Sequence, residues 1–133
     1  MPSVAITLNN LGLLLKETNE FQQARAYYEE TLEIHRELSR QNPKAYRPDV
    51  ATSLNNLGLL FQSTDELEQA RACYEESLAL RRELSEHNPE AYKLELATTQ
   101  QNLTLLYLQQ GEEEKAEMAY QEAHDIYQEL AGK

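Results

Sequence analysis

Three asparagines at equal spacing carry the clearest chemical signal in this sequence. Asn10, Asn56 and Asn102 stand 46 residues apart in a chain of 133 residues. A carboxamide donates and accepts hydrogen bonds at the same time, which is what the N–H and C=O groups of a peptide backbone need in a partner. These side chains could therefore hold the main chain of an extended peptide, or they could instead cap or bridge neighbouring helices.

Residues typical of catalytic and metal sites are present, but not at the spacing that such sites require. The histidines are His35, His87 and His124, and they belong to no HExxH or CxxC pattern. Cys73 is the single cysteine and no base is placed to activate it. The acidic run 112–114 suits the positive end of a helix dipole. We therefore predict no enzyme activity, no metal and no cofactor.

The asparagines belong to a repeat of 46 residues. The motif NNLG at 9–12 returns at 55–58, and it returns in a more diverged form as QNLT at 101–104. Apolar residues around these motifs recur at steps of three and four, the period of one helical face. A repeat of this kind indicates helical hairpins that stack, because one hairpin cannot bury both of its apolar faces.

Turn and capping signals divide each unit into two helices. Asn42-Pro43 and Asn88-Pro89 are expected to end a helix, because the residue before a proline is pushed out of the helical region. A tight turn is expected at Thr64-Asp65-Glu66 and at the equivalent Gln110-Gly111-Glu112, because Asp and Gly tolerate a left-handed turn or cap the next helix. The expected helices cover about 3–18, 20–41, 48–64, 66–87, 94–109 and 112–131, with Pro48 in the first turn of the third. We predict one all-α domain over residues 1–133, with repeats at about 2–47, 48–93 and 94–133.

The middle unit resembles the core pattern of the tetratricopeptide repeat in its residues Leu54, Leu57, Gly58, Phe61, Ala70 and Tyr74. The standard repeat is shorter, at about 34 residues. The long second helix and the LNNLG opening most resemble the repeats of kinesin light chains and related bacterial proteins. The resemblance implies a right-handed α-solenoid of three helix-turn-helix hairpins, with six antiparallel helices and a concave groove lined by the first helix of each unit.

The groove positions follow from the side of the first helices that faces away from the core. Unit by unit they are Ile6, Asn10, Leu13 and Glu17; Thr52, Asn56, Leu59 and Ser63; Thr98, Asn102, Leu105 and Gln109. In similar repeats the second asparagine of the NN pair holds a bound peptide's main chain, and the resemblance carries this role to the three asparagines. The leucine rungs would form side-chain pockets, or they could be core residues.

The two ends of the array differ in sequence. His124 stands where the first two units have Leu32 and Leu78, so the last helix is expected to be a polar cap. Val4 and Ile6 keep the first helix apolar, which predicts an N-terminal face that either continues a longer array or is buried in a homodimer. Homo-oligomerisation through Val4 and Ile6 is therefore the alternative to peptide binding.

The charge of the chain bears on its partners. A formal net charge of −11, from 23 acidic and 12 basic residues, repels phosphate backbones and anionic lipid. Nucleic acid and membrane are thus disfavoured, and a protein or peptide partner of neutral to basic character is favoured. The sequence has no run of 18 apolar residues and no signal-peptide pattern. With a single cysteine, this favours a cytoplasmic location.

Overall fold

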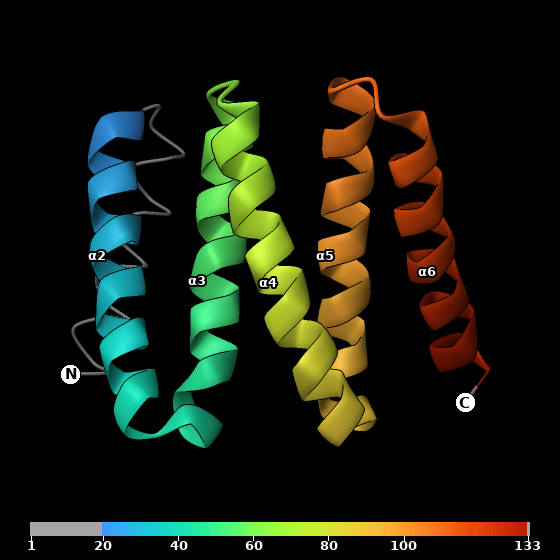
Figure 1. Ribbon diagram of the computed structural model, residues 1–133, viewed down its shortest axis with the longest axis horizontal. Helices are drawn as coiled ribbons and strands as arrows, with labels where there is room; N and C mark the ends of the chain where they lie inside the picture. The colour runs from blue at the N-terminus through green and yellow to red at the C-terminus, as the bar shows by residue number, and fades with distance from the viewer. Residues whose placement is uncertain (1–19, 133) are drawn as a thin grey trace.

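The computed structural model describes residues 20–132, which form a row of helices (Figure 1). The helices are α2 (Phe21–Gln41), α3 (Pro43–Ser63), α4 (Leu67–His87), α5 (Pro89–Gln109) and α6 (Glu113–Ala131). Each helix packs against the next, and α3 also touches α5. The predicted all-α class is confirmed for this part of the chain. The expected first helix, 3–18, lies outside the described residues, and right-handed winding stays a prediction.

The joint between α2 and α3 is a single residue, Asn42. Its N–H donates to the carbonyl of Leu38 at 2.9 Å, and its side chain accepts from the N–H of Ala45 at 3.4 Å. Asn42 therefore ends one helix and caps the next. Pro43 takes the first position of α3, where its missing N–H costs nothing.

Asn88 and Pro89 repeat this arrangement between α4 and α5. The prediction that helices begin at about 48 and 94 is therefore wrong. The proline that stops one helix starts the next, and Pro48 lies inside α3 rather than in its first turn. The residues that lengthen this repeat thus extend the first helix of each unit as well as the second.

Within each hairpin the turn follows the Schellman pattern of backbone bonds. The N–H of Glu66 donates to the carbonyl of Phe61 at 2.8 Å, and the equivalent bond joins Glu112 to Tyr107 at 2.8 Å. Asp65 has φ +61° and the equivalent Gly111 has φ +76°. The expected left-handed turn is confirmed in both hairpins. The corresponding turn at 18–20 falls almost entirely outside the described residues.

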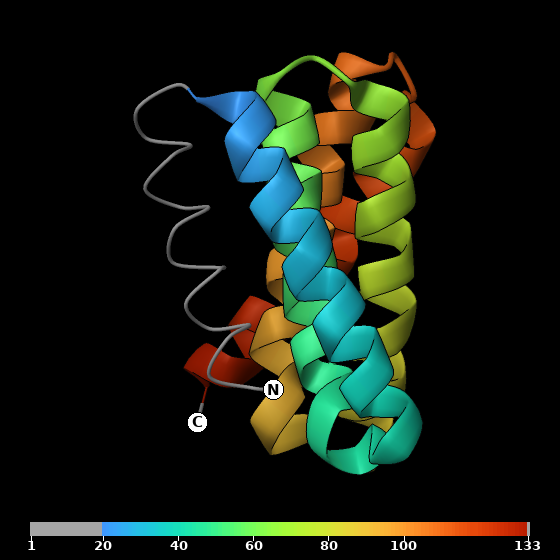
Figure 2. The ribbon, with the colours of Figure 1, turned by 90° about the vertical axis from the view of Figure 1, so that its left-hand side faces the viewer.

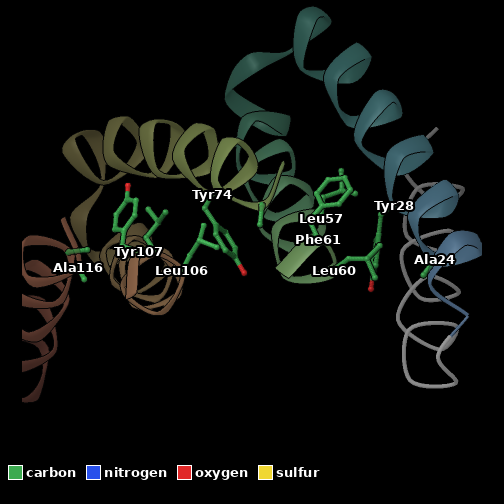
Figure 3. Close-up of a cluster of buried hydrophobic side chains, with 12 residues drawn as sticks. Ala24, Tyr28, Leu57, Leu60, Phe61, Tyr74, Leu106, Tyr107 and Ala116 are labelled. Carbon is green, nitrogen blue, oxygen red and sulfur yellow. The ribbon is translucent and has the colours of Figure 1, made fainter. Parts of the chain in front are cut away.

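One cluster of buried apolar side chains includes residues from all five helices (Figure 3). Seen from the α2 end, the helices overlap and do not lie in one plane (Figure 2). The buried members of the cluster are Ala24, Tyr28, Leu57, Leu60, Phe61, Ala70, Tyr74, Leu103, Leu106, Tyr107, Ala116 and Ala119. At the centre, the ring of Tyr74 is fully buried against Gly58. A Cβ on Gly58 would lie 2.6 Å from Cδ1 and Cε1 of that ring. Only glycine admits the ring here.

Candidate functional site

The predicted groove residues of α3 and α5 are on or near the surface. Exposed members are Thr52, Ser63, Leu105 and Gln109, and half-buried members are Asn56, Leu59, Thr98 and Asn102. The predicted rungs of the first unit, with Asn10 and Leu13, and the predicted interface residues Val4 and Ile6 lie outside the described residues. The predicted groove positions can therefore be placed for two of the three units, and they lie on helices that contact each other.

Asn102 is held in place by a hydrogen bond between units. Its Nδ2 donates to Oδ1 of Asn55 at 3.0 Å, and Asn55 is only 8% exposed. The first asparagine of the NN pair is thus a buried bridge, while the second stays half-buried at the surface. The bond fixes the carboxamide of Asn102 and uses one of its hydrogen-bonding positions, so its Oδ1 remains able to accept from another molecule.

The hydroxyl and amide groups of the groove positions are partly engaged by the helices themselves. The Oγ of Ser63 donates to the carbonyl of Leu59 at 2.9 Å, and the Oγ1 of Thr98 donates to the carbonyl of Leu94 at 3.0 Å. Gln109 accepts from Nε2 of Gln62 at 2.6 Å. Each of these oxygens keeps some accepting capacity, but less than that of a free side chain.

The two leucine rungs differ in exposure. Leu59 is half-buried and packs against the core, whereas Leu105 is 57% exposed. We attribute the difference to α5, which covers part of α3, while no described helix covers the same part of α5. Leu59 therefore serves packing at least as much as it could serve a ligand.

A buried polar bridge, which sequence reasoning missed, crosses each joint between units. Nη1 of Arg81 on α4 donates to Oγ1 of Thr99 at 2.6 Å and to the carbonyl of Glu95 at 3.3 Å on α5. Its Nη2 donates to Oγ1 of Thr52 at 3.4 Å. Arg81 is only 6% exposed; burial lowers its pKa, and the Glu95 carboxylate opposes this. Thr52 is thereby tied to α4 as well as facing solvent.

The equivalent bridge one unit earlier joins His35 to Ser53, with Nδ1 and Oγ 2.7 Å apart. With Asp49 nearby, these residues have the composition of a hydrolytic triad, but Ser53 is 3% exposed and no substrate could reach it. Burial lowers the pKa of His35, and Asp49 opposes that shift. His35 and Arg81 are equivalent positions 46 residues apart, and so are Ser53 and Thr99. The presence of polar residues at both positions in both units was the sequence signal that could have predicted the bridge.

Cys73 has the environment of an inert thiol. It is half-buried, and burial, with the nearby Glu76 carboxylate adding to it, raises its pKa to about 11. A nucleophilic cysteine needs a lowered pKa. Among residues 20–132 no group of three or more metal-ligating side chains comes together, and no helix there could span a membrane.

Two arginine contacts repeat along the array and tie each second helix to the following unit. In the first, which we call the arginine clamp, Arg25 lies over the ring of Phe61 at 5.0 Å and pairs with Glu66 at 3.5 Å. One unit later Arg71 lies over Tyr107 at 5.3 Å and pairs with Glu112. The clamp thus joins a cation to an aromatic ring and to the acid at the next hairpin turn.

The second contact, which we call the arginine fork, is a two-bond ion pair. Arg36 donates to both carboxylate oxygens of Glu76, at 2.8 and 3.1 Å. Arg82 does the same with Glu122, at 2.6 and 2.9 Å. The bond from Arg82 holds the pKa of Glu122 below its usual value, and Gln100 adds to this effect. The pairing aligns successive second helices.

The last hairpin exposes several apolar side chains beside polar ones. The expected polar cap concerned the last helix, whose exposed residues are mostly polar, His124 and Asp125 among them, with Met118 and Tyr120 as the large apolar exceptions. In residues 20–132, every large apolar side chain that is exposed belongs to this hairpin: Leu94, Leu105, Leu108, Met118 and Tyr120. His124 stacks on Tyr120, with ring centroids 5.8 Å apart. A pocket of about 280 Å³ opens beside them, lined by Gln101, Thr104, Leu105, Tyr120, Ala123, His124 and Tyr127.

Comparisons with known proteins agree with this architecture. Two models described as tetratricopeptide repeat match residues 3–83 and 96–133. This chain is similar to the crystal structure of BtubC (BKLC) from P. vanneervenii, a kinesin light chain-like protein. The match has a TM-score of 0.84 and 31% sequence identity, and it covers 98% of the chain described here. The chain spans about half of that protein, 49% of its length. No curated protein matches the sequence.

Proposed function

Since the chain belongs to the tetratricopeptide repeat family, whose members generally mediate protein–protein interactions, we propose that it is a non-catalytic scaffold for a peptide segment of a partner protein. The segment would lie extended across α3 and α5, with Asn56 and Asn102 bonding its main chain. The observation that carries the proposal is the Asn55–Asn102 bond, which orients a surface carboxamide and leaves its Oδ1 available.

The charge of the surface supports a ligand that is not acidic. The groove positions on α3 and α5 hold no lysine or arginine, and the chain carries a net charge of −11. A peptide carboxylate would find no cation in these positions, whereas a neutral or basic segment would meet no repulsion. We therefore propose a neutral to basic peptide, bound in the cytoplasm.

The test is selection from a random peptide display library. The parent is compared with a variant carrying Asn56→Ala and Asn102→Ala, and with a control carrying Gln23→Ala and Gln69→Ala. The control residues are exposed, lie on the second helices and have the same 46-residue spacing. We expect the parent and the control to enrich a shared motif that the asparagine variant loses while its circular dichroism is unchanged. Enrichment that survives in the asparagine variant would refute the assignment.

Homo-oligomerisation through the N-terminal face is the alternative, favoured by Ile6 standing where the second unit has Thr52. Under that alternative, Val4→Lys with Ile6→Lys would reduce the mass measured by light scattering and leave peptide selection unchanged. A monomeric mass for the parent would exclude it.

A further inference from the structure

The side of the α5/α6 hairpin that carries the pocket is equivalent to a side of the α3/α4 hairpin that is already occupied. On α3 and α4 that side comprises Asn55, Leu59, Gln62, Tyr74, Ser77 and Arg81, and α5 covers it through the bonds of Asn55, Gln62 and Arg81. Adding 46 to each number gives what we call the α5/α6 face: Gln101, Leu105, Leu108, Tyr120, Ala123 and Tyr127.

The exchange of residues makes the α5/α6 face more apolar than its counterpart. Gln62 becomes Leu108, Ser77 becomes Ala123 and Arg81 becomes Tyr127. The consequence for exposure is large, since Tyr74 is fully buried while Tyr120 is 56% exposed. A contiguous patch with a pocket at its centre is typical of an interaction site. The covered counterpart indicates the shape that fits it, an α-helix lying as α5 lies on α3 and α4.

The charges around the α5/α6 face differ from those that hold α5 and α6 in place. The clamp arginines Arg25 and Arg71 are succeeded by Glu117, and the fork arginines Arg36 and Arg82 are succeeded by Gln128. A second copy of this chain would bring Glu20, the equivalent of Glu66 and Glu112, against Glu117. Two carboxylates would then meet where the internal units have an ion pair, which disfavours self-stacking.

We propose that the α5/α6 face is a docking surface for an amphipathic helix of another protein, one that carries a basic residue at the position corresponding to Glu112. The apolar side of that helix would cover Leu105, Leu108 and Tyr120, and its cation would pair with Glu117. This surface adjoins the peptide groove along α5 and shares Leu105 with it, while Leu108 and the α6 residues Tyr120, Ala123 and Tyr127 belong to the α5/α6 face alone.

The experiment uses two synthetic probes built on the helix that covers the counterpart. One is the peptide 89–112 of this chain, and the other is the same peptide with Glu112→Lys. Binding of each labelled peptide to the full chain is measured by fluorescence anisotropy. We expect the lysine peptide to bind about tenfold more tightly, and the chain variant Glu117→Arg to reverse that preference.

Two further chain variants locate the site. Tyr120→Lys should weaken the lysine peptide by about tenfold or more, as expected when a charge enters the centre of an apolar interface; Tyr120 lines the pocket and is not a groove position. Met118→Lys is the matched control, because Met118 is 74% exposed on α6 but does not line the pocket, and it should leave binding unchanged. Both side chains are exposed, so both variants should fold.

Three outcomes would overturn the proposal. The parent could bind the two peptides equally, or Met118→Lys could weaken binding as much as Tyr120→Lys does. The third outcome is a concentration-dependent dimer in light scattering that Tyr120→Lys abolishes, which would identify a second copy as the occupant. Peptide selection with the asparagine variants is a separate measurement. A negative result in the anisotropy experiment therefore leaves the proposed groove function unaffected, and loss of the groove assignment leaves the α5/α6 docking proposal unaffected.

Discussion

The α3/α4 and α5/α6 hairpins share a backbone plan and differ in the surface that each turns toward a following unit. In α3/α4, Gly58 admits the ring of Tyr74, and polar side chains bond to α5. In α5/α6, Thr104 stands in place of the glycine and Tyr120 remains exposed. No helix within residues 20–132 covers Tyr120, which contributes to that exposure, but a Cβ at position 104 would by itself exclude the ring from the place that Tyr74 takes. The two hairpins therefore differ at a few side chains in the surface that α5 covers on α3/α4.

Giving the middle hairpin the residue of the last one should have the largest effect. Gly58→Thr places a Cβ 2.6 Å from two ring carbons of a fully buried tyrosine, so the ring must shift within the core. Overpacking of this kind costs about 1 to 3 kcal/mol in the free energy of unfolding. Urea denaturation followed by circular dichroism measures it.

The control for that substitution is Gly132→Thr, where a Cβ would meet only ordinary contacts, 3.5 Å and beyond. An unfolding midpoint for Gly58→Thr equal to that of the parent would mean that Tyr74 does not depend on the glycine.

Removing the clamp should have the next largest effect. Arg71→Ala loses the contact with Tyr107 and the pair with Glu112, and we expect a loss of about 1 kcal/mol, because the arginine is partly exposed to solvent. Glu117→Ala at the equivalent position should change stability by less than about 0.5 kcal/mol. Equal losses for the two variants, in parallel urea titrations, would show that the clamp contributes nothing specific.

Giving the last hairpin the glycine of the middle one should couple two residues that are now independent. In the parent, Tyr120→Ala should have little effect, because the ring is 56% exposed. In a Thr104→Gly background the ring gains room to pack on α5, so Tyr120→Ala should cost about 0.5 to 1 kcal/mol more than in the parent. A double-mutant cycle by thermal denaturation measures this coupling, and a coupling of zero would show that the covering helix alone controls Tyr120.

The smallest effect separates the two buried bridges by their pH dependence. Burial lowers the pKa of His35 in the folded chain below its ordinary value of 6.5, so the unfolded chain binds the proton more readily. The stability that depends on neutral His35 is present above pH 6.5 and is lost as the pH falls from there through the lowered pKa. The Arg81 bridge does not titrate in this range.

Unfolding midpoints in urea at pH 7.5 and pH 5.5 test this difference. The parent should lose more stability than His35→Gln between the two values, because glutamine keeps a hydrogen-bonding group but no titrating one. The same loss in both proteins would assign the pH dependence to other groups.

Much of the fold could be predicted because the same apolar and turn residues recur at equivalent positions in successive units. The apolar spacing gave the core residues Leu57, Phe61 and Tyr74, and the turn residues gave the left-handed positions Asp65 and Gly111. The starts of α3 and α5 were missed, since a proline after asparagine ends one helix and begins another with equal ease. Local sequence does not say which of these a proline does.

The candidate site was less predictable than the fold. The stripe containing Asn56 and Asn102 could be read from helical periodicity, but the bond from Asn102 to Asn55 joins two helices and depends on their spacing. His124 predicted a polar last helix, and it carried no information on the apolar side chains that α5 exposes. The α5/α6 face is built from both helices, and identifying it required the contacts that α5 makes with α3 and α4.

The two one-residue joints repeat the same backbone geometry. Asn42 has φ −144° and ψ 81°, and Asn88 has φ −146° and ψ 80°, so both joints turn the chain through the same angle. A flexible linker would absorb a pull on the two ends by extending. Here the helices of residues 20–132 follow one another through joints and turns of one to three residues, so a pull must instead bend helices or separate their packed faces.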